Sequence, residues 1–127
     1  MVQKHTSMSN LPKILPARFF CTALGTEPVR EWLRELDKGD CRIIGEDIKT
    51  VEFGWPVGMP LCRSIIGYKD LWEVRSKLTG GRIARVIFYI RDGQMILLHG
   101  FVKKTQKTSP NDLDLAIKRK KEHEKNV

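Results

Sequence analysis

Hydrophobic positions in the first half of the chain follow a helical period. Apolar residues recur three and four positions apart after Pro28 and again after Asp40, which places them on one side of each segment. We therefore expect two short helices forming an α-hairpin, the first ending near Gly39 and the second capped by Asp40. The two apolar stripes are Val29, Trp32, Leu33 and Leu36, then Cys41, Ile44, Ile48 and Val51.

In the second half, hydrophobic and polar positions alternate, which predicts strands. Glycine-containing turns separate three such runs, so neighbouring runs should pair as an antiparallel meander. An earlier apolar run contains Pro16, which confines it to a sheet edge. The three runs are 71–78, 82–90 and 95–103, the turns are 79–81 and 92–93, and the edge run is 13–21.

A final helix should begin at Ser109 and Pro110, a typical cap followed by proline at the first helical position. The order of elements predicts an α+β fold: a small antiparallel β-sheet, an N-terminal α-hairpin and a C-terminal helix. We expect one domain over residues 13–127, preceded by a flexible N-terminal segment, 1–12.

Composition narrows the class of protein. The 127 residues are 41% hydrophobic and 30% charged, and no apolar run approaches the ~20 residues of a membrane span. Three widely spaced cysteines and three separated histidines favour neither a disulfide framework nor a metal site. With no stretch resembling a signal peptide, we expect a cytoplasmic protein that needs no metal or cofactor and binds no membrane.

The net charge of +8 is distributed unevenly. Residues 64–127 hold 14 of the 23 basic and 7 of the 15 acidic side chains, so nearly all the excess lies in this half. This asymmetry indicates a surface for nucleic acid or an acidic partner. A generally soluble basic protein would show the same total.

Alternation places Arg75, Lys77 and Arg85 on the sheet face opposite the helices, with Arg85 pointing outward. Metal-free RNA cleavage needs a base for the ribose 2′-hydroxyl, cations for the phosphate and an acid for the leaving oxygen. Arginine suits the phosphate, and His99 or a desolvated lysine suits proton transfer. Further basic residues follow at Lys103, Lys104 and Lys107.

Each of these residues also has an ordinary structural interpretation. Arg75 can pair with Glu73, and a lone histidine on a strand, such as His99, is usually structural. Phe101 can be a half-buried sheet residue or a surface on which a base stacks. The basic run of the last helix is most often a solvated helix end; it comprises Lys118, Arg119, Lys120 and Lys121.

The register of the last hairpin stays open. A two-residue loop at 92–93 puts Arg85 on one face with Gly100, Val102 and Lys104. A three-residue loop puts it with His99, Phe101 and Lys103, because a slip of one residue exchanges the faces.

Several segments together resemble the phage-derived, HigB-like branch of the RelE/ParE toxin superfamily. The resemblance runs from about Pro28 to Glu122. The segments that carry it are Phe53–Leu61, Leu71–Arg75, Ala84–Tyr89 and Leu98–Thr108.

The resemblance implies a compact toxin fold and metal-independent cleavage of mRNA in the ribosomal A site. It also implies a helix-turn-helix, HigA-like antitoxin as partner. Basic residues of the central sheet then contact the scissile phosphate, at Arg75 and Arg85 with Lys103 or Lys104. The tyrosine near the C-terminus of the RelE branch is missing here, since only Tyr68 and Tyr89 are present.

The expected function is therefore a toxin that acts as an endoribonuclease and inhibits translation. Catalytic candidates are Arg75, Arg85, His99 and Lys103; RNA-binding candidates are Lys77, Phe101, Lys104, Lys107, Lys118, Arg119, Lys120 and Lys121. The alternatives are a non-catalytic basic module that binds RNA or the ribosome, and a protein that only binds an acidic regulator.

Overall fold

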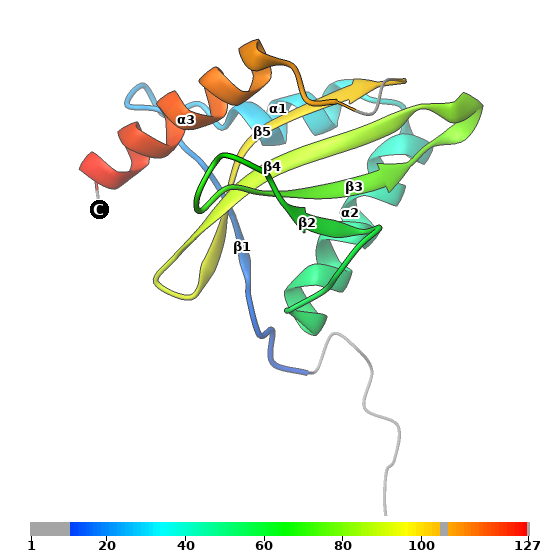
Figure 1. The fold of residues 1–127 in the computed structure, drawn as a ribbon, viewed down its shortest axis with the longest axis horizontal. Helices are drawn as coiled ribbons and strands as arrows, with labels where there is room; N and C mark the ends of the chain where they lie inside the picture. Colours follow the sequence, from blue (N-terminus) through cyan, green and yellow to red (C-terminus); the bar gives the residue numbers. More distant parts are fainter. Residues whose placement is uncertain (1–10, 105–106, 127) are drawn as a thin grey trace, which may run out of the picture.

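The computed structural model of the chain describes residues 11–104 and 107–126, so the predicted segment 1–12 lies almost wholly outside the described residues. The described strands form one five-stranded sheet with helices on both faces (Figure 1). In chain order the elements are β1 (Ala17–Phe19), α1 (Pro28–Glu35), α2 (Lys38–Gly54), β2 (Cys62–Ser64), β3 (Trp72–Lys77), β4 (Ile83–Arg91), β5 (Gln94–Lys103) and α3 (Pro110–Lys125).

The sheet is mixed rather than purely antiparallel. Its order is β1-β5-β4-β3-β2, and β1 runs parallel to β5, whereas the other pairs are antiparallel. The predicted antiparallel sheet is therefore wrong at one edge, although β1 occupies the edge that Pro16 indicated. The other edge, β2, was missed because three residues are too short to show a period.

The α-hairpin is present, with its junction earlier than predicted. Asp37, not Asp40, caps α2: its side chain accepts a hydrogen bond from the Asp40 backbone N at 2.8 Å. Gly39 therefore lies in the first turn of α2. Asp40 instead binds Arg82 through both carboxylate oxygens, at 2.8 and 3.1 Å, which ties α2 to the turn before β4.

The α-hairpin covers one face of the sheet, and α3 covers the other (Figure 1). Under the hairpin lies an apolar core that includes Val74, Val86 and Phe88. A second apolar cluster, including Ile87 and Leu98, lies under α3. The sheet face that carries Arg75 and Arg85 was expected to be open to solvent, but α3 covers it. Leu113 and Ala116 give α3 an apolar side that packs there.

The last hairpin combines a two-residue turn with a bulge. Asp92 and Gly93 both have positive φ, 52° and 74°, as a tight hairpin turn requires. The ladder then shifts between Ile87 and Phe88, leaving one extra residue on β5. From there Arg85 pairs with Phe101. The two-residue loop is the one expected to place Arg85 on one face with Gly100, Val102 and Lys104. Because of the bulge, Arg85 instead shares its face with His99, Phe101 and Lys103.

Candidate functional site

Arg75 and Arg85 lie directly opposite each other on β3 and β4. Glu73, two residues before Arg75 on the same face, is fully buried. Its carboxylate binds the Nε of Arg63, on β2, at 2.5 Å and lies 3.7 Å from the Nε of Arg75. We call Arg63, Glu73, Arg75 and Arg85 the arginine cluster. Three cations of one sheet face thus surround one carboxylate.

Arg85 is buried, with 0% of its surface exposed, so the expectation that it points outward is wrong. Burial lowers the pKa of its guanidinium; Glu73 opposes this effect, and Arg75 and Arg63 add to it. The segment between β5 and α3 also approaches the cluster, since Thr108 Oγ1 donates to Glu73 at 3.1 Å. Arg63 and Arg75, with side chains 31% and 13% exposed, are the accessible members of the cluster.

A second charged group lies where β5 meets the start of α3. His99 Nε2 lies 2.7 Å from Asp112 Oδ1, and Lys103 Nζ binds the other carboxylate oxygen at 2.8 Å. Ser109 Oγ donates to that same oxygen at 2.6 Å. On its other side, His99 Nδ1 lies 3.5 Å from Arg119 Nη1. We call His99, Lys103 and Asp112 the histidine cluster; both ring nitrogens of His99 contact α3.

Burial and these contacts define the charge state of the histidine cluster. Burial would raise the pKa of Asp112, but hydrogen bonds from Lys103, Ser109 and His99 lower it to about 2. Burial lowers the pKa of His99 below its usual 6.5, despite the attraction of Asp112. At neutral pH the carboxylate is therefore ionised and the imidazole is neutral, the form that can accept a proton.

Phe101 connects the two clusters. It pairs with Arg85 across the strands, and its ring stacks on His99 with centroids 5.4 Å apart. The Lys103 ammonium lies 5.2 Å from the ring centroid. Because Phe101 is 9% exposed, its predicted stacking on an RNA base would require these neighbours to move.

The remaining predicted RNA-binding residues separate into exposed and inward-facing sets. Within α3, Arg119 donates to the Leu98 carbonyl at 2.9 Å, and Lys120 lies over the Tyr89 ring. The basic end of α3 is therefore only half solvated. The exposed residues are Lys77, Lys104, Lys107, Lys118 and Lys121.

Three residues of these clusters were not among the predicted site residues. Asp112, in the first turn of α3, brings a carboxylate to His99 and Lys103 of β5. Arg63 belongs to the short strand that no period revealed. Glu73 was considered as a partner of Arg75, whereas its carboxylate lies at the centre of the arginine cluster.

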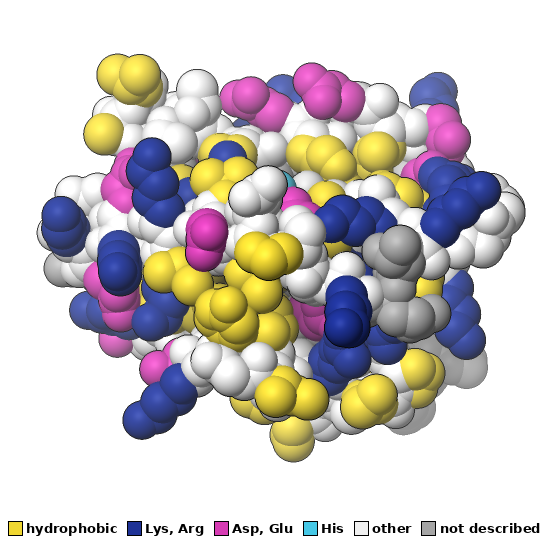
Figure 2. All heavy atoms as spheres, turned by 45° about the horizontal axis from the view of Figure 1, so that its top comes forward, with side chains coloured by type: hydrophobic (Ala, Val, Ile, Leu, Met, Phe, Trp, Pro, Cys, Tyr) yellow, Lys and Arg dark blue, Asp and Glu magenta, His cyan; other side chains and the backbone are white. Residues whose placement is uncertain are grey.

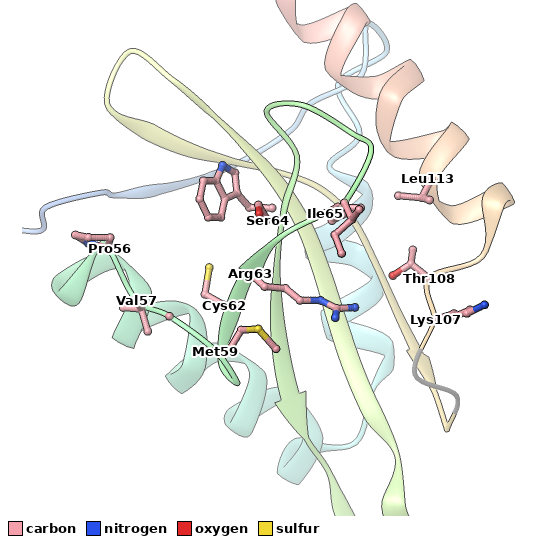
Figure 3. A pocket seen from close by; sticks show the side chains of 13 residues that line it. Pro56, Val57, Met59, Cys62, Arg63, Ser64, Ile65, Lys107, Thr108 and Leu113 are labelled. Atoms are coloured by element: carbon pink, nitrogen blue, oxygen red, sulfur yellow. The ribbon is translucent and has the colours of Figure 1, made fainter.

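A groove of about 1070 Å³ borders the arginine cluster. Figure 3 shows Thr108 and Lys107 on one side, Val57 and Met59 on the other, and Arg63 reaching from β2 between them. The groove is bounded by the loop after α2, by β2 and by the start of α3. Its other lining residues include Cys62, Ser64, Ile65, Ile66, Trp72 and Leu113.

Within residues 11–104 and 107–126, His, Cys, Asp and Glu form no group of three or more that could hold a metal ion. In the same part of the chain, the helices are too short or too polar to cross a membrane.

A comparison with protein families matches residues 31–121 to the family described as Phage derived protein Gp49-like (DUF891). The match begins within α1 and covers α2, the strands from β2 to β5 and most of α3, which is more than half of the chain, so the chain belongs to this family. The family consists of toxin-like proteins of the RelE/HigB type. A search of curated proteins finds no match.

Proposed function

We propose that this protein is the toxin of a type II toxin-antitoxin system and cleaves mRNA on the ribosome without a metal ion. The observation that supports this most directly is the pairing of Arg75 with Arg85 around the buried Glu73. The histidine cluster lies on the same face, beside Phe101. Cations for a phosphate and a group for proton transfer are thus neighbours on one sheet.

In the proposed reaction the ribose 2′-oxygen loses its proton to a base and attacks the adjacent phosphorus. The bond to the 5′-oxygen breaks, and that oxygen takes up a proton, which leaves a cyclic phosphate and a 5′-hydroxyl. Arg75 and Arg63 would stabilise the charge on the phosphate, and Arg85 would support them from beneath. His99 would accept the first proton, with Lys103 beside it. Lys104 and Lys107 would position the RNA.

A helix-turn-helix, HigA-like antitoxin is the proposed partner, with the ribosome as the place of action. The net charge of +8 supports an acidic or nucleic-acid partner. The exposed Lys118 and Lys121 of α3 are the residues proposed to meet ribosomal RNA.

The test is Arg75→Gln, which removes the charge and keeps most of the side-chain volume. We expect cleavage on purified ribosomes to fall about 10²–10³-fold, the loss typical of one electrostatic stabiliser. Arg42→Gln, an exposed arginine of α2 on the other side of the sheet, is the matched control and should cleave normally. A folded Arg75→Gln variant with full activity would contradict the proposal.

The products provide a second readout. Cleavage should survive EDTA kept below the magnesium concentration that the ribosome needs, which removes transition metals, and should leave 5′-hydroxyl ends. Ends bearing a 5′-phosphate would indicate attack by metal-activated water instead.

Two observations favour a second candidate, a non-catalytic module that binds RNA or the ribosome. Arg85 is buried, and both ring nitrogens of His99 already contact α3. Ribosome association without cleavage, at saturating protein, would select this candidate.

A further inference from the structure

The groove beside the arginine cluster combines an apolar lining with cations on one side. Met59 is 68% exposed, a large hydrophobic surface in contact with solvent. Arg63 and Lys107 supply positive charge, and no Asp or Glu of the described residues lines the groove. A ligand that fits this chemistry has an apolar body and an anionic group.

Two residues belong both to the groove and to the surroundings of Glu73. Arg63 lines the groove and binds Glu73 through its Nε. Thr108 lines the groove and donates to the other oxygen of Glu73. Figure 3 shows the Arg63 guanidinium pointing towards the side where Thr108 and Lys107 lie. A ligand in the groove therefore lies next to the proposed phosphate site.

We propose that this groove binds one nucleotide of single-stranded RNA, with its base on the apolar lining and a phosphate at Arg63 and Lys107. The choice of RNA as ligand rests on the proposed function. The nucleotide in the groove is the neighbour of the nucleotide whose scissile phosphate lies at Arg75, and Arg63, which belongs both to the arginine cluster and to the groove, contacts the phosphates of both. The groove would then help to select which bond is cleaved.

The shape and chemistry of the groove favour a nucleotide over a protein segment. On the side of the molecule that Figure 2 shows, apolar side chains gather near the centre, with Lys and Arg to the left and right of them and some Asp and Glu in between. A nucleotide combines the flat face of its base with a phosphate in one residue of the RNA chain. Met59 is polarizable and adaptable, so it can pack against different bases, and Trp72 adds an aromatic surface. An acidic amphipathic peptide is the competing occupant.

The experiment measures binding by fluorescence anisotropy with two labelled probes that cannot be cleaved through a 2′-hydroxyl. The first is hexadeoxyadenylate, and the second is an oligomer of six abasic deoxyribose units with the same phosphates. Their affinity ratio isolates the contribution of the bases. Base stacking typically makes such a ratio about 5–150-fold, so the wild-type protein should bind the first probe at least about fivefold more tightly.

Matched substitutions locate the effect. Met59→Ser should bring the affinity ratio close to one. Leu24→Ser, which removes an even more exposed apolar side chain in the loop before α1, should leave the ratio unchanged. Lys107→Gln should weaken both probes equally and reduce the slope of binding against salt by about one counterion.

Two outcomes would overturn the proposal. The first is a ratio near one for the wild-type protein. The second is a ratio that Met59→Ser leaves unchanged, since the bases would then lie elsewhere. With a ratio near one, displacement of the probe by an amphipathic Leu/Glu peptide, lost in Met59→Ser, would assign the groove to a protein partner.

The result is separable from the proposed function because neither probe is cleaved and no ribosome is present. A ratio that behaves as expected, together with no cleavage by the wild-type protein, would refute the endonuclease and retain the groove as a nucleotide site of a binding module. Cleavage that depends on Arg75, together with a ratio of one, would retain the endonuclease and refute the groove.

Discussion

The two faces of the sheet differ in the kind of side chain that the same strands bury. Beneath the α-hairpin the contacts are apolar and close: Trp32 of α1 lies so near Gly100 that a Cβ there would be 2.4 Å from the indole ring. Beneath α3, the same strands present the buried Glu73 and Arg85. One face therefore provides stability through packing, and the other holds charge where water is largely excluded.

This difference shows how a small domain can bury ionised groups. An isolated charge in an apolar interior is strongly unfavourable, so each one here has a counter-ion or a hydrogen bond. Glu73 has Arg63, Arg75 and Thr108 around it, and Asp112 has Lys103. The charged face is thus built as a network in which each member depends on the others.

The largest effect should come from removing Glu73. Glu73→Ala leaves the arginines of its cluster without their carboxylate, and losing one partner of a buried charge pair typically costs about 3–5 kcal/mol of the free energy of unfolding. Urea denaturation followed by circular dichroism measures this cost. Glu27→Ala, which removes an exposed pair with Arg30, is the control and should cost about 0.2–1 kcal/mol. Equal losses for the two variants would show that the cluster contributes no more than a surface pair.

The apolar face should respond to an added methyl group. Gly100→Ala forces Trp32 to move, and overpacking of this kind typically costs about 1–3 kcal/mol. Thermal unfolding gives the comparison with Gly45→Ala, where a Cβ meets nothing within 4 Å and the helix interior should gain about 0.5–1 kcal/mol. A neutral Gly100→Ala variant would mean that the hairpin tolerates displacement from the sheet.

The smallest effect should be a pH dependence of stability that belongs to the α3 side. Burial holds the pKa of His99 below its unfolded value of 6.5, so the unfolded chain binds a proton first. The contribution of His99 to the free energy of unfolding is complete above pH 6.5 and is lost as the pH falls through the pKa of the folded state. Asp112, with a pKa of about 2 against 3.8 when unfolded, keeps its contribution until the pH falls below about 3.8.

Urea denaturation at pH 7.5, 6 and 5 tests this dependence. His99→Gln should flatten the decline. His123 is the second histidine to control, because burial beside Tyr89 also lowers its pKa. If His123→Gln removes the whole pH dependence, the effect comes from the end of α3 and not from the histidine cluster.

Local pattern was sufficient for much of this architecture. Alternation along β3 and β4 correctly placed Arg75 and Arg85 on the face away from the hairpin, because successive side chains of a strand point in opposite directions. Proline at the start of α1, and Ser109 with Pro110 before α3, correctly marked both helix starts. These features depend on neighbours within a few residues.

What the tertiary structure decided depends on residues far apart in the chain. The bulge in β5 aligned Arg85 with Phe101, and no local pattern specifies which residue leaves the ladder. The helix α3 covered the face expected to be open, so Arg85 is buried and His99 contacts both Asp112 and Arg119. β2 brought Arg63 to Glu73 across the sheet edge. The sequence specifies which residues are charged or polar. Their burial and their interaction partners depend on tertiary packing, and burial and partners determine what the charged groups can do.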